Sequence, residues 1–136
     1  MSMFGAFDVA GSALSAQSLR VNLTASHLAN MHNVAGNPDE IYRARHALFS
    51  ASQGTFAQAL AGVDVLGVVE SPAPAIERYD PGHPQANEQG LVYASNVNAM
   101  EEMANMISAS RSYQSSLEVI NTAKDLLLRT LSLGQA

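Results

Sequence analysis

The fold is decided by residues 7–28, which read FDVAGSALSAQSLRVNLTASHL and contain no proline. Apolar side chains recur at every seventh position of this stretch, at Phe7, Leu14, Val21 and Leu28. Small or polar residues stand three and four positions further on, so together they form one stripe along a helix. A second, weaker line runs through Val9, Ala16 and Leu23. The spacing predicts a helix of about 25 residues with two packing surfaces, roughly 37 Å long.

The other end of the chain repeats this pattern, since residues 97–133 contain neither proline nor glycine. Apolar side chains alternate here by threes and fours, at Met103, Met106, Tyr113, Leu117, Ile120, Leu127 and Leu131. The alternation predicts a single helix of about 35 residues. Ser95 or Asn96 could cap its start, and Gly134 stands where a C-cap would. Glu101 and Glu102 suit the positive end of the helix dipole.

The middle of the chain differs, because residues 36–96 hold all five prolines. Short runs of β-like composition alternate with proline-containing turns, at Tyr42–Phe49, Val63–Glu70, Ala75–Tyr79 and Leu91–Tyr93. About 60 residues of this kind bury little apolar surface by themselves. We therefore expect a small sheet or set of hairpins carried on the helices.

The expected fold class is mainly α, with long N- and C-terminal helices packed as a coiled-coil-like pair and a small β-rich middle region inserted between them. Residues 1–35 are expected to form the N-terminal helix, residues 36–96 the outer region, and residues 97–136 the C-terminal helix. The two apolar stripes are expected to be buried against each other.

The charge balance excludes several functions. Seven Lys and Arg stand against twelve Asp and Glu, giving a net charge of -5, which argues against binding nucleic acid. The absence of cysteine removes disulfides and thiolate metal sites. The first residues show no pattern of a cleaved secretion signal, and no apolar run approaches the ~20 residues of a membrane-spanning helix.

The first 36 residues are nearly free of charge, because Asp8 is their one acidic residue and Arg20 is their one Lys or Arg. Ser, Thr, Asn and Gln lose little conformational entropy when they are covered, so such a surface suits contact with several protein neighbours. Two interpretations remain open. Either the helices polymerise with other subunits, or both stripes form the core of a monomeric helical hairpin.

The titratable residues do not form an evident chemical site. Four histidines, His27, His32, His46 and His83, are candidate metal ligands, but His27 and His32 lie on different sides of a helix and no Glu or Asp completes a set. Glu101 and Glu102 are adjacent and diverge on a helix, which favours a solvated helix start over a catalytic pair. We expect no metal, no cofactor and no catalytic residue. Arg111 could bond carbonyls or an Asp of another chain, or be an ordinary surface arginine.

Ordered motifs along nearly the whole chain carry a resemblance to a known family. The opening Phe4–Leu14, which reads FGAFDVAGSAL, resembles the N-terminal helix of bacterial flagellar rod and hook proteins. Tyr79–Pro84, YDPGHP, and Ile107–Gln114, ISASRSYQ, are similar to segments of rod proteins in that family.

The resemblance implies a structural subunit of the flagellar proximal rod, part of the drive shaft that transmits torque from the motor to the hook and filament. It implies export by the flagellar type III apparatus without a cleaved signal, and a location in the basal body across the periplasm. The implied partners are copies of the chain, the rod proteins FlgB, FlgF and FlgG, the adapter FliE and the export apparatus. The alternatives are a cytosolic helical-hairpin adaptor that forms a closed dimer and, as a third hypothesis, a small hydrolase using Ser and His.

The candidate interface residues come from the two stripes and from the family motifs. They are Phe7, Leu14, Val21, Asn22, Leu28 and Asn30 in the first helix, and Met103, Ile107, Arg111, Tyr113, Leu117, Ile120, Leu127 and Leu131 in the last.

Overall fold

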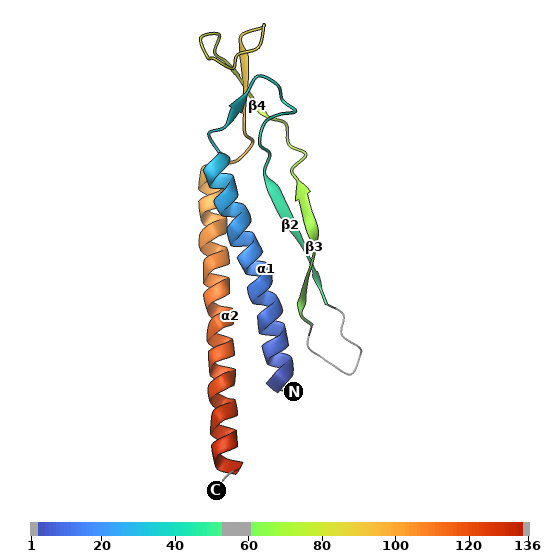
Figure 1. Cartoon of the computed structure of the whole chain (residues 1–136), viewed down its shortest axis with the longest axis vertical. Coiled ribbons are helices and arrows are strands. Elements are labelled where there is room, and N and C mark those ends of the chain that lie inside the picture. Colours follow the sequence, from blue (N-terminus) through green and yellow to red (C-terminus); the bar gives the residue numbers. More distant parts are fainter. Residues whose placement is uncertain (1–2, 53–60, 135–136) are drawn as a thin grey trace.

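A computed structural model describes residues 3–52 and 61–134 of the chain. Two long helices lie side by side and run in opposite directions, α1 over Met3–Asn30 and α2 over Ala99–Gly134 (Figure 1). The described residues between them form β1 (Val34–Ala35), β2 (Arg45–Ala51), β3 (Val63–Glu70), β4 (Ile76–Tyr79) and β5 (Leu91–Ala94). The expected fold class is thus confirmed in its coarser form, as helices at both ends with small antiparallel sheets between them. Residues 1–2, 53–60 and 135–136 of the three expected zones lie outside the described residues.

The start of α2 differs from the prediction. The side-chain oxygen of Asn98 accepts the backbone N–H of Met100 at 3.1 Å, so Asn98 is the N-cap rather than Ser95 or Asn96. Asn96 is engaged elsewhere, because its side-chain oxygen accepts the N–H of Ala44 at 2.9 Å. Ser95 is buried, and its backbone N–H bonds to a loop carbonyl after α1. Both candidates are thus engaged in tertiary hydrogen bonds, and Asn98 caps the helix in their place.

The strands form two separate antiparallel sheets. One has the order β1-β5-β4 and lies where α1 ends and α2 begins, since short connections join β1 to α1 and β5 to α2. Gly90, just before β5, has a φ of 73°, and a Cβ there would lie 3.0 Å from the ring of Tyr79. A side chain at this position would both strain the backbone and meet the ring.

The second sheet is a two-stranded ribbon of β2 and β3, with its register shifted between Leu48 and Phe49. It runs along α1 on the side away from α2 (Figure 1). The prediction of β3 had the observed bounds, and those of β2, β4 and β5 were within three residues at each end. Sequence analysis did not predict β1, a two-residue strand that exists through its pairing with β5.

Candidate assembly surfaces

Small side chains make the contact between α1 and α2. The buried alanines of the two helices are Ala10, Ala16, Ala109 and Ala123, and Ala109 is 0% exposed. The separation of two packed helices depends on the side chains at their contact, so methyl groups allow a close approach. Several larger apolar residues of α2 are exposed, whereas Met106, Ile120 and Leu127 are half-buried.

Many large apolar side chains of α2 are exposed, alongside exposed charged residues such as Glu118 and Asp125. The residues that we call the outer α2 surface are Met100, Met103, Ile107, Tyr113, Leu117, Val119, Leu126, Leu128, Leu131 and Leu133, all exposed. Large exposed apolar areas mark candidate sites of protein contact.

The expected mutual burial of the Phe7–Leu28 and Met103–Leu131 stripes is therefore wrong for part of the α2 stripe. Phe7, Leu14, Val21 and Leu28 are half-buried. Of the α2 candidates, Met103, Ile107, Tyr113, Leu117 and Leu131 are exposed, as is Arg111, while Ile120 and Leu127 are half-buried. Ala109 and Ala123 stand three positions after Met106 and Ile120, so the buried alanines share one side of α2 with these half-buried residues of the predicted stripe.

The two polar candidates of α1 lie differently. Asn22 is exposed, whereas Asn30 is half-buried and its side-chain N–H donates to the carbonyl of Ser26 at 2.8 Å. Asn30 therefore helps to end α1, and Asn22 remains available for contact.

The C-terminal end of α2 reaches past the beginning of α1 (Figure 1), because α2 has 36 residues and α1 has 28. This end carries four of the leucines of the outer α2 surface, Leu126, Leu128, Leu131 and Leu133, with exposed fractions from 51% to 77%. The pair of helices thus ends in an apolar segment of one helix.

The β2–β3 ribbon also exposes large apolar side chains. These are Leu48 and Phe49 on β2 and Val65, Leu66, Val68 and Val69 on β3. In the described part of the chain, neither strand pairs with a third strand, so both edges of the ribbon retain free backbone groups. The ribbon is the second surface suited to protein contact.

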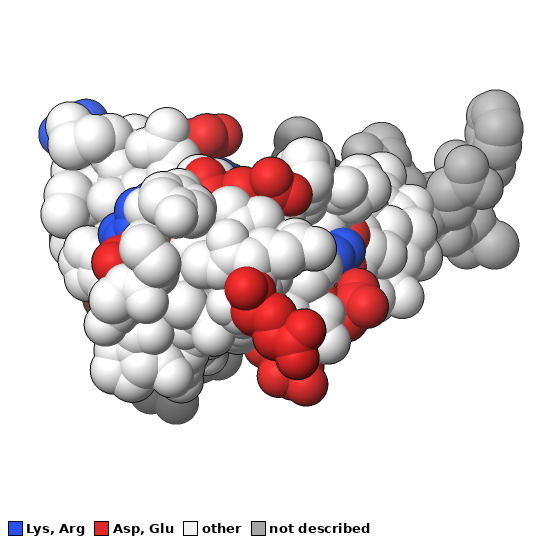
Figure 2. All heavy atoms as spheres, turned by 90° about the horizontal axis from the view of Figure 1, so that it is seen from above, with Lys and Arg blue, Asp and Glu red and all other residues white. Residues whose placement is uncertain are grey.

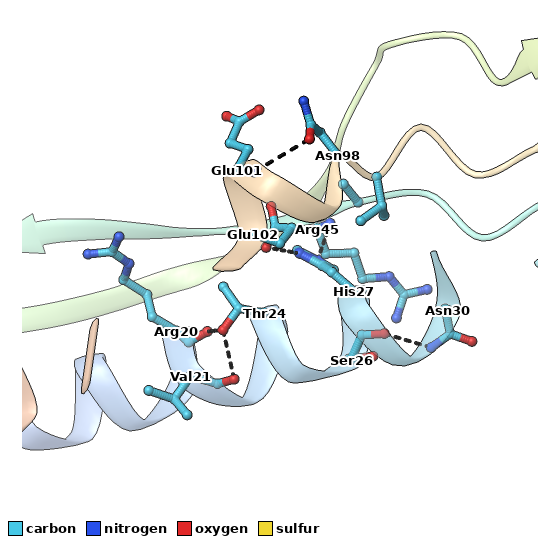
Figure 3. Close-up of polar contacts among 12 residues, drawn as sticks. Arg20, Val21, Thr24, Ser26, His27, Asn30, Arg45, Asn98, Glu101 and Glu102 are labelled. Carbon is cyan, nitrogen blue, oxygen red and sulfur yellow. Dashed lines mark hydrogen bonds and ion pairs between the residues drawn. The ribbon is translucent and has the colours of Figure 1, made fainter. Parts of the chain in front are cut away.

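A buried polar cluster joins the ribbon to both helices (Figure 3). Nδ1 of His27, on α1, lies 2.7 Å from Oε2 of Glu102, on α2, and the backbone N–H of Arg45, on β2, donates to Nε2 of His27 at 2.9 Å. His27 is 2% exposed and Glu102 is 5% exposed. The expectation that Glu102 is a solvated residue of the helix start is wrong, because His27 covers it. The two residues are 75 positions apart, so no local pattern could have paired them.

Further bonds fix the ribbon along α1. The backbone N–H of Val63 donates to the hydroxyl of Ser12 at 3.0 Å. The hydroxyl groups of Ser26 and Tyr42 lie 3.1 Å apart. Single hydrogen bonds at separate points, rather than a broad apolar contact, therefore set the position of the ribbon.

Most of the surface at the loop end of the molecule carries no charge, and acidic side chains stand there in separate groups (Figure 2). Within residues 3–52 and 61–134, no group of three or more His, Cys, Asp or Glu side chains is arranged to hold a metal ion. Over the same residues, neither helix is apolar enough over sufficient length to span a bilayer.

Comparison with known proteins agrees with a role in assembly. Residues 88–133 match the family model described as flagellar basal body rod FlgEFG protein C-terminal. The chain is 47% identical over 135 residues to a relative from Salmonella typhimurium and to another from Escherichia coli O6:H1, covering 99% of this chain and 100% of each relative. A relative from Buchnera aphidicola subsp. Acyrthosiphon pisum is 39% identical over 137 residues, with the same coverage.

The chain therefore belongs to the flagellar basal-body rod proteins. The three relatives are named flagellar basal-body rod protein FlgC, and the group within that class to which the chain belongs is the FlgC family.

Proposed function

We propose that this chain is a structural subunit of the bacterial flagellar basal-body rod and acts by packing rather than by catalysis. The observation that carries this proposal is full-length identity of 47% to relatives named as rod proteins. Those relatives are named as components of a rod rather than as enzymes. The apolar outer α2 surface supports the same function, because it requires protein neighbours to remove it from water.

In the proposed arrangement, the zones of residues 1–35 and 97–136 contribute α1 and α2 to a coiled-coil-like inner layer of the proximal rod, and residues 36–96 project outward from it. Side-by-side packing of α1 and α2 supports this division. A shaft that transmits torque from the motor to the hook must resist shear, and closely packed interiors have low compressibility and transmit strain. The alanine contact between α1 and α2 provides such packing within each subunit.

The proposed contacts with neighbours use the candidate residues that the fold leaves accessible. Met103, Ile107, Arg111, Tyr113, Leu117 and Leu131 are exposed on α2, and Asn22 is exposed on α1. The half-buried candidates contribute the part of their surface that is still exposed to the contacts with neighbours. These candidates are Phe7, Leu14, Val21, Leu28, Asn30, Ile120 and Leu127. The low charge of α1 reduces the cost of removing this helix from water.

The proposed neighbours are copies of the chain and other rod components. Membership in the rod family supports assembly with such components in general. FlgB, FlgF, FlgG and the adapter FliE are the particular partners that we propose, after export through the flagellar type III apparatus without a cleaved signal.

The test replaces Leu117 with Asp in cells that make the variant in place of the native chain. Leu117 is 42% exposed, so the substitution should leave the subunit folded. In the assembled rod it would place an unpaired charge in an apolar contact, at a cost on the order of 3–5 kcal/mol. We expect loss of the protein from isolated basal bodies and loss of swimming, with export unchanged.

The matched control is Gln89→Asp, which adds the same charge at an exposed position in the loop before β5. This variant should assemble and swim. Normal incorporation of Leu117→Asp into basal bodies would contradict the proposed contact.

The closed-dimer adaptor in the cytosol is not favoured, because the relatives that match the full chain are rod proteins. Analytical ultracentrifugation combined with cell fractionation distinguishes the two functions. A stable closed dimer that stays in the cytosol would replace our proposal with the adaptor.

A further inference from the structure

His27 occupies the point where three elements meet, and its two ring nitrogens serve different elements (Figure 3). Nε2 accepts the backbone N–H of Arg45 at 2.9 Å, so this nitrogen presents its lone pair and carries no proton. A neutral imidazole then has its proton on Nδ1, which donates to Oε2 of Glu102 at 2.7 Å. The geometry thus defines both the neutral state and the tautomer of His27.

The surroundings of the ring offer no second acceptor for a proton on Nε2 among the bonds of the described residues. The ring of Tyr42 meets the imidazole edge-on at 6.1 Å, and the ring of His46 does so at 6.2 Å. The guanidinium of Arg45 is turned to Glu70, which it contacts at 2.9 Å. Glu102 is therefore the partner that faces His27 from α2, and the Arg45 N–H is the partner from β2.

A cavity of about 140 Å³ lies beside this cluster and is lined by side chains that include Arg20, Thr24 and Asn105. This volume exceeds what one water molecule needs. The guanidinium of Arg20 points away from the imidazole in Figure 3. A proton therefore has room to approach the cluster, although His27 itself is 2% exposed.

We propose that His27 is a proton-sensitive joint between the helix pair and the β2–β3 ribbon. Neutral His27 holds the first residue of the ribbon, whereas protonation at Nε2 places an N–H directly against the N–H of Arg45. Two donors cannot share a hydrogen bond, so the proton displaces the ribbon from this point. Two other attachments, from Val63 to the hydroxyl of Ser12 and from Ala44 to the side chain of Asn96, contain no group that titrates near neutral pH.

The test measures amide hydrogen exchange of the full chain by NMR, expressed as protection factors so that the intrinsic effect of pH is removed. The comparison runs from about pH 7.5 to about pH 5.5, the range in which imidazoles change charge. Protection of the Arg45 amide should fall by about tenfold, the equivalent of one lost hydrogen bond, while protection of the Val63 amide stays constant. The Val63 amide is thus an internal control within the same ribbon.

Two variants separate the roles of the ring nitrogens. His27→Gln places an amide oxygen near the position of Nε2 and does not titrate, so protection of Arg45 should become independent of pH. His27→Asn keeps a donor near the position of Nδ1 but supplies nothing at Nε2, so protection of Arg45 should be low at both pH values.

Unchanged protection of Arg45 in the native chain would overturn the proposal, because it would place the proton on Glu102 or nowhere in the cluster. A parallel fall for Arg45 and Val63 would overturn it too, since it would indicate general acid unfolding. The same would follow from a pH-dependent Arg45 amide in His27→Gln.

Discussion

The helix pair and the β2–β3 ribbon are held in place by different kinds of contact. The helices contact each other through alanines and similar small residues, so two backbones lie close together over a long distance. The ribbon has no second layer of its own, and single bonds from His27, Asn96 and Ser12 fix its position. Loss of one methyl group from the helix contact thus has a local effect, whereas loss of one hydrogen bond can release an end of the ribbon from the helices.

Both regions nevertheless leave large apolar residues outside. Leu66 on the ribbon is 69% exposed, and Leu133 on α2 is 77% exposed. A chain that uses small side chains inside and large ones outside gains hydrophobic stabilisation when neighbours cover it. The comparison therefore indicates that assembly completes both regions.

The largest effect on stability is expected from His27→Ala, which removes the side chain that joins the helix pair to the ribbon. This change leaves the Glu102 carboxylate and the Arg45 N–H without their partner, at about 1–3 kcal/mol for each buried group. We expect the free energy of unfolding to fall by about 2–5 kcal/mol, measured by urea denaturation followed by circular dichroism. His32→Ala, at an exposed position, should change it little. Equal effects of the two variants would refute the structural role of the cluster.

The next prediction concerns the helix pair alone. Ala109→Leu adds three carbons where no space is left, because Ala109 is 0% exposed. Overpacking of this kind costs about 1–3 kcal/mol, and a lower midpoint of thermal unfolding should report it. Ala104→Leu makes the same change at an exposed position of α2 and should be nearly neutral. A tolerated Ala109→Leu would mean that the helices do not pack through this line.

A smaller effect is expected at the start of α2. Asn98→Ala removes the acceptor for the N–H of Met100 and should lower stability by about 1 kcal/mol. Asn121→Ala, exposed in the middle of the same helix, should instead raise stability slightly through helix propensity. Thermal unfolding of both variants gives the comparison, and a loss in Asn121→Ala matching that in Asn98→Ala would contradict the assigned cap.

The smallest effect is expected from the side chain of Arg45. Its guanidinium lies 2.9 Å from the Glu70 carboxylate, but the two side chains are 51% and 57% exposed. Exposed ion pairs contribute about 0–1 kcal/mol and weaken with salt. Arg45→Ala should therefore change the denaturation midpoint by less than His27→Ala at every salt concentration. A larger loss would show that the side chain, rather than the backbone N–H, holds the ribbon.

Local pattern predicted the elements well but not the side of each helix that faces inward. The seven-residue spacing of Phe7, Leu14, Val21 and Leu28 predicted α1, and a run of β-like composition before a proline-containing turn predicted β3. The burial of Ala109 and Ala123 was not predicted, because alanine is a weaker apolar signal in a sequence than leucine or methionine. Inward orientation depends on how closely two helices approach, which a single helix pattern does not contain.

The candidate site divides in the same way. The family motifs and the low charge of the first 36 residues indicated an assembly protein, and the outer α2 surface contains Met103, Ile107 and Leu117 among the residues named from sequence. The sequence pattern presents His27 as a metal-ligand candidate and Glu102 as a helix-start carboxylate or a member of a catalytic pair, and it does not indicate the bond between them. The hydrogen bond between His27 and Glu102 exists because the fold brings α1 and α2 together. The two residues are 75 positions apart, so the sequence around either one does not indicate the other.

The sequence alone determined that the chain has two long terminal helices, a short β-rich insertion and membership in a family of rod proteins, because periodicity, proline placement and ordered motifs are properties of neighbouring residues. The tertiary contacts establish that alanines are the most deeply buried apolar residues of the helices, that most leucines of α2 are exposed and that a histidine joins the ribbon to both helices. These features depend on distances between segments far apart in the chain, and such distances follow from packing rather than from local order.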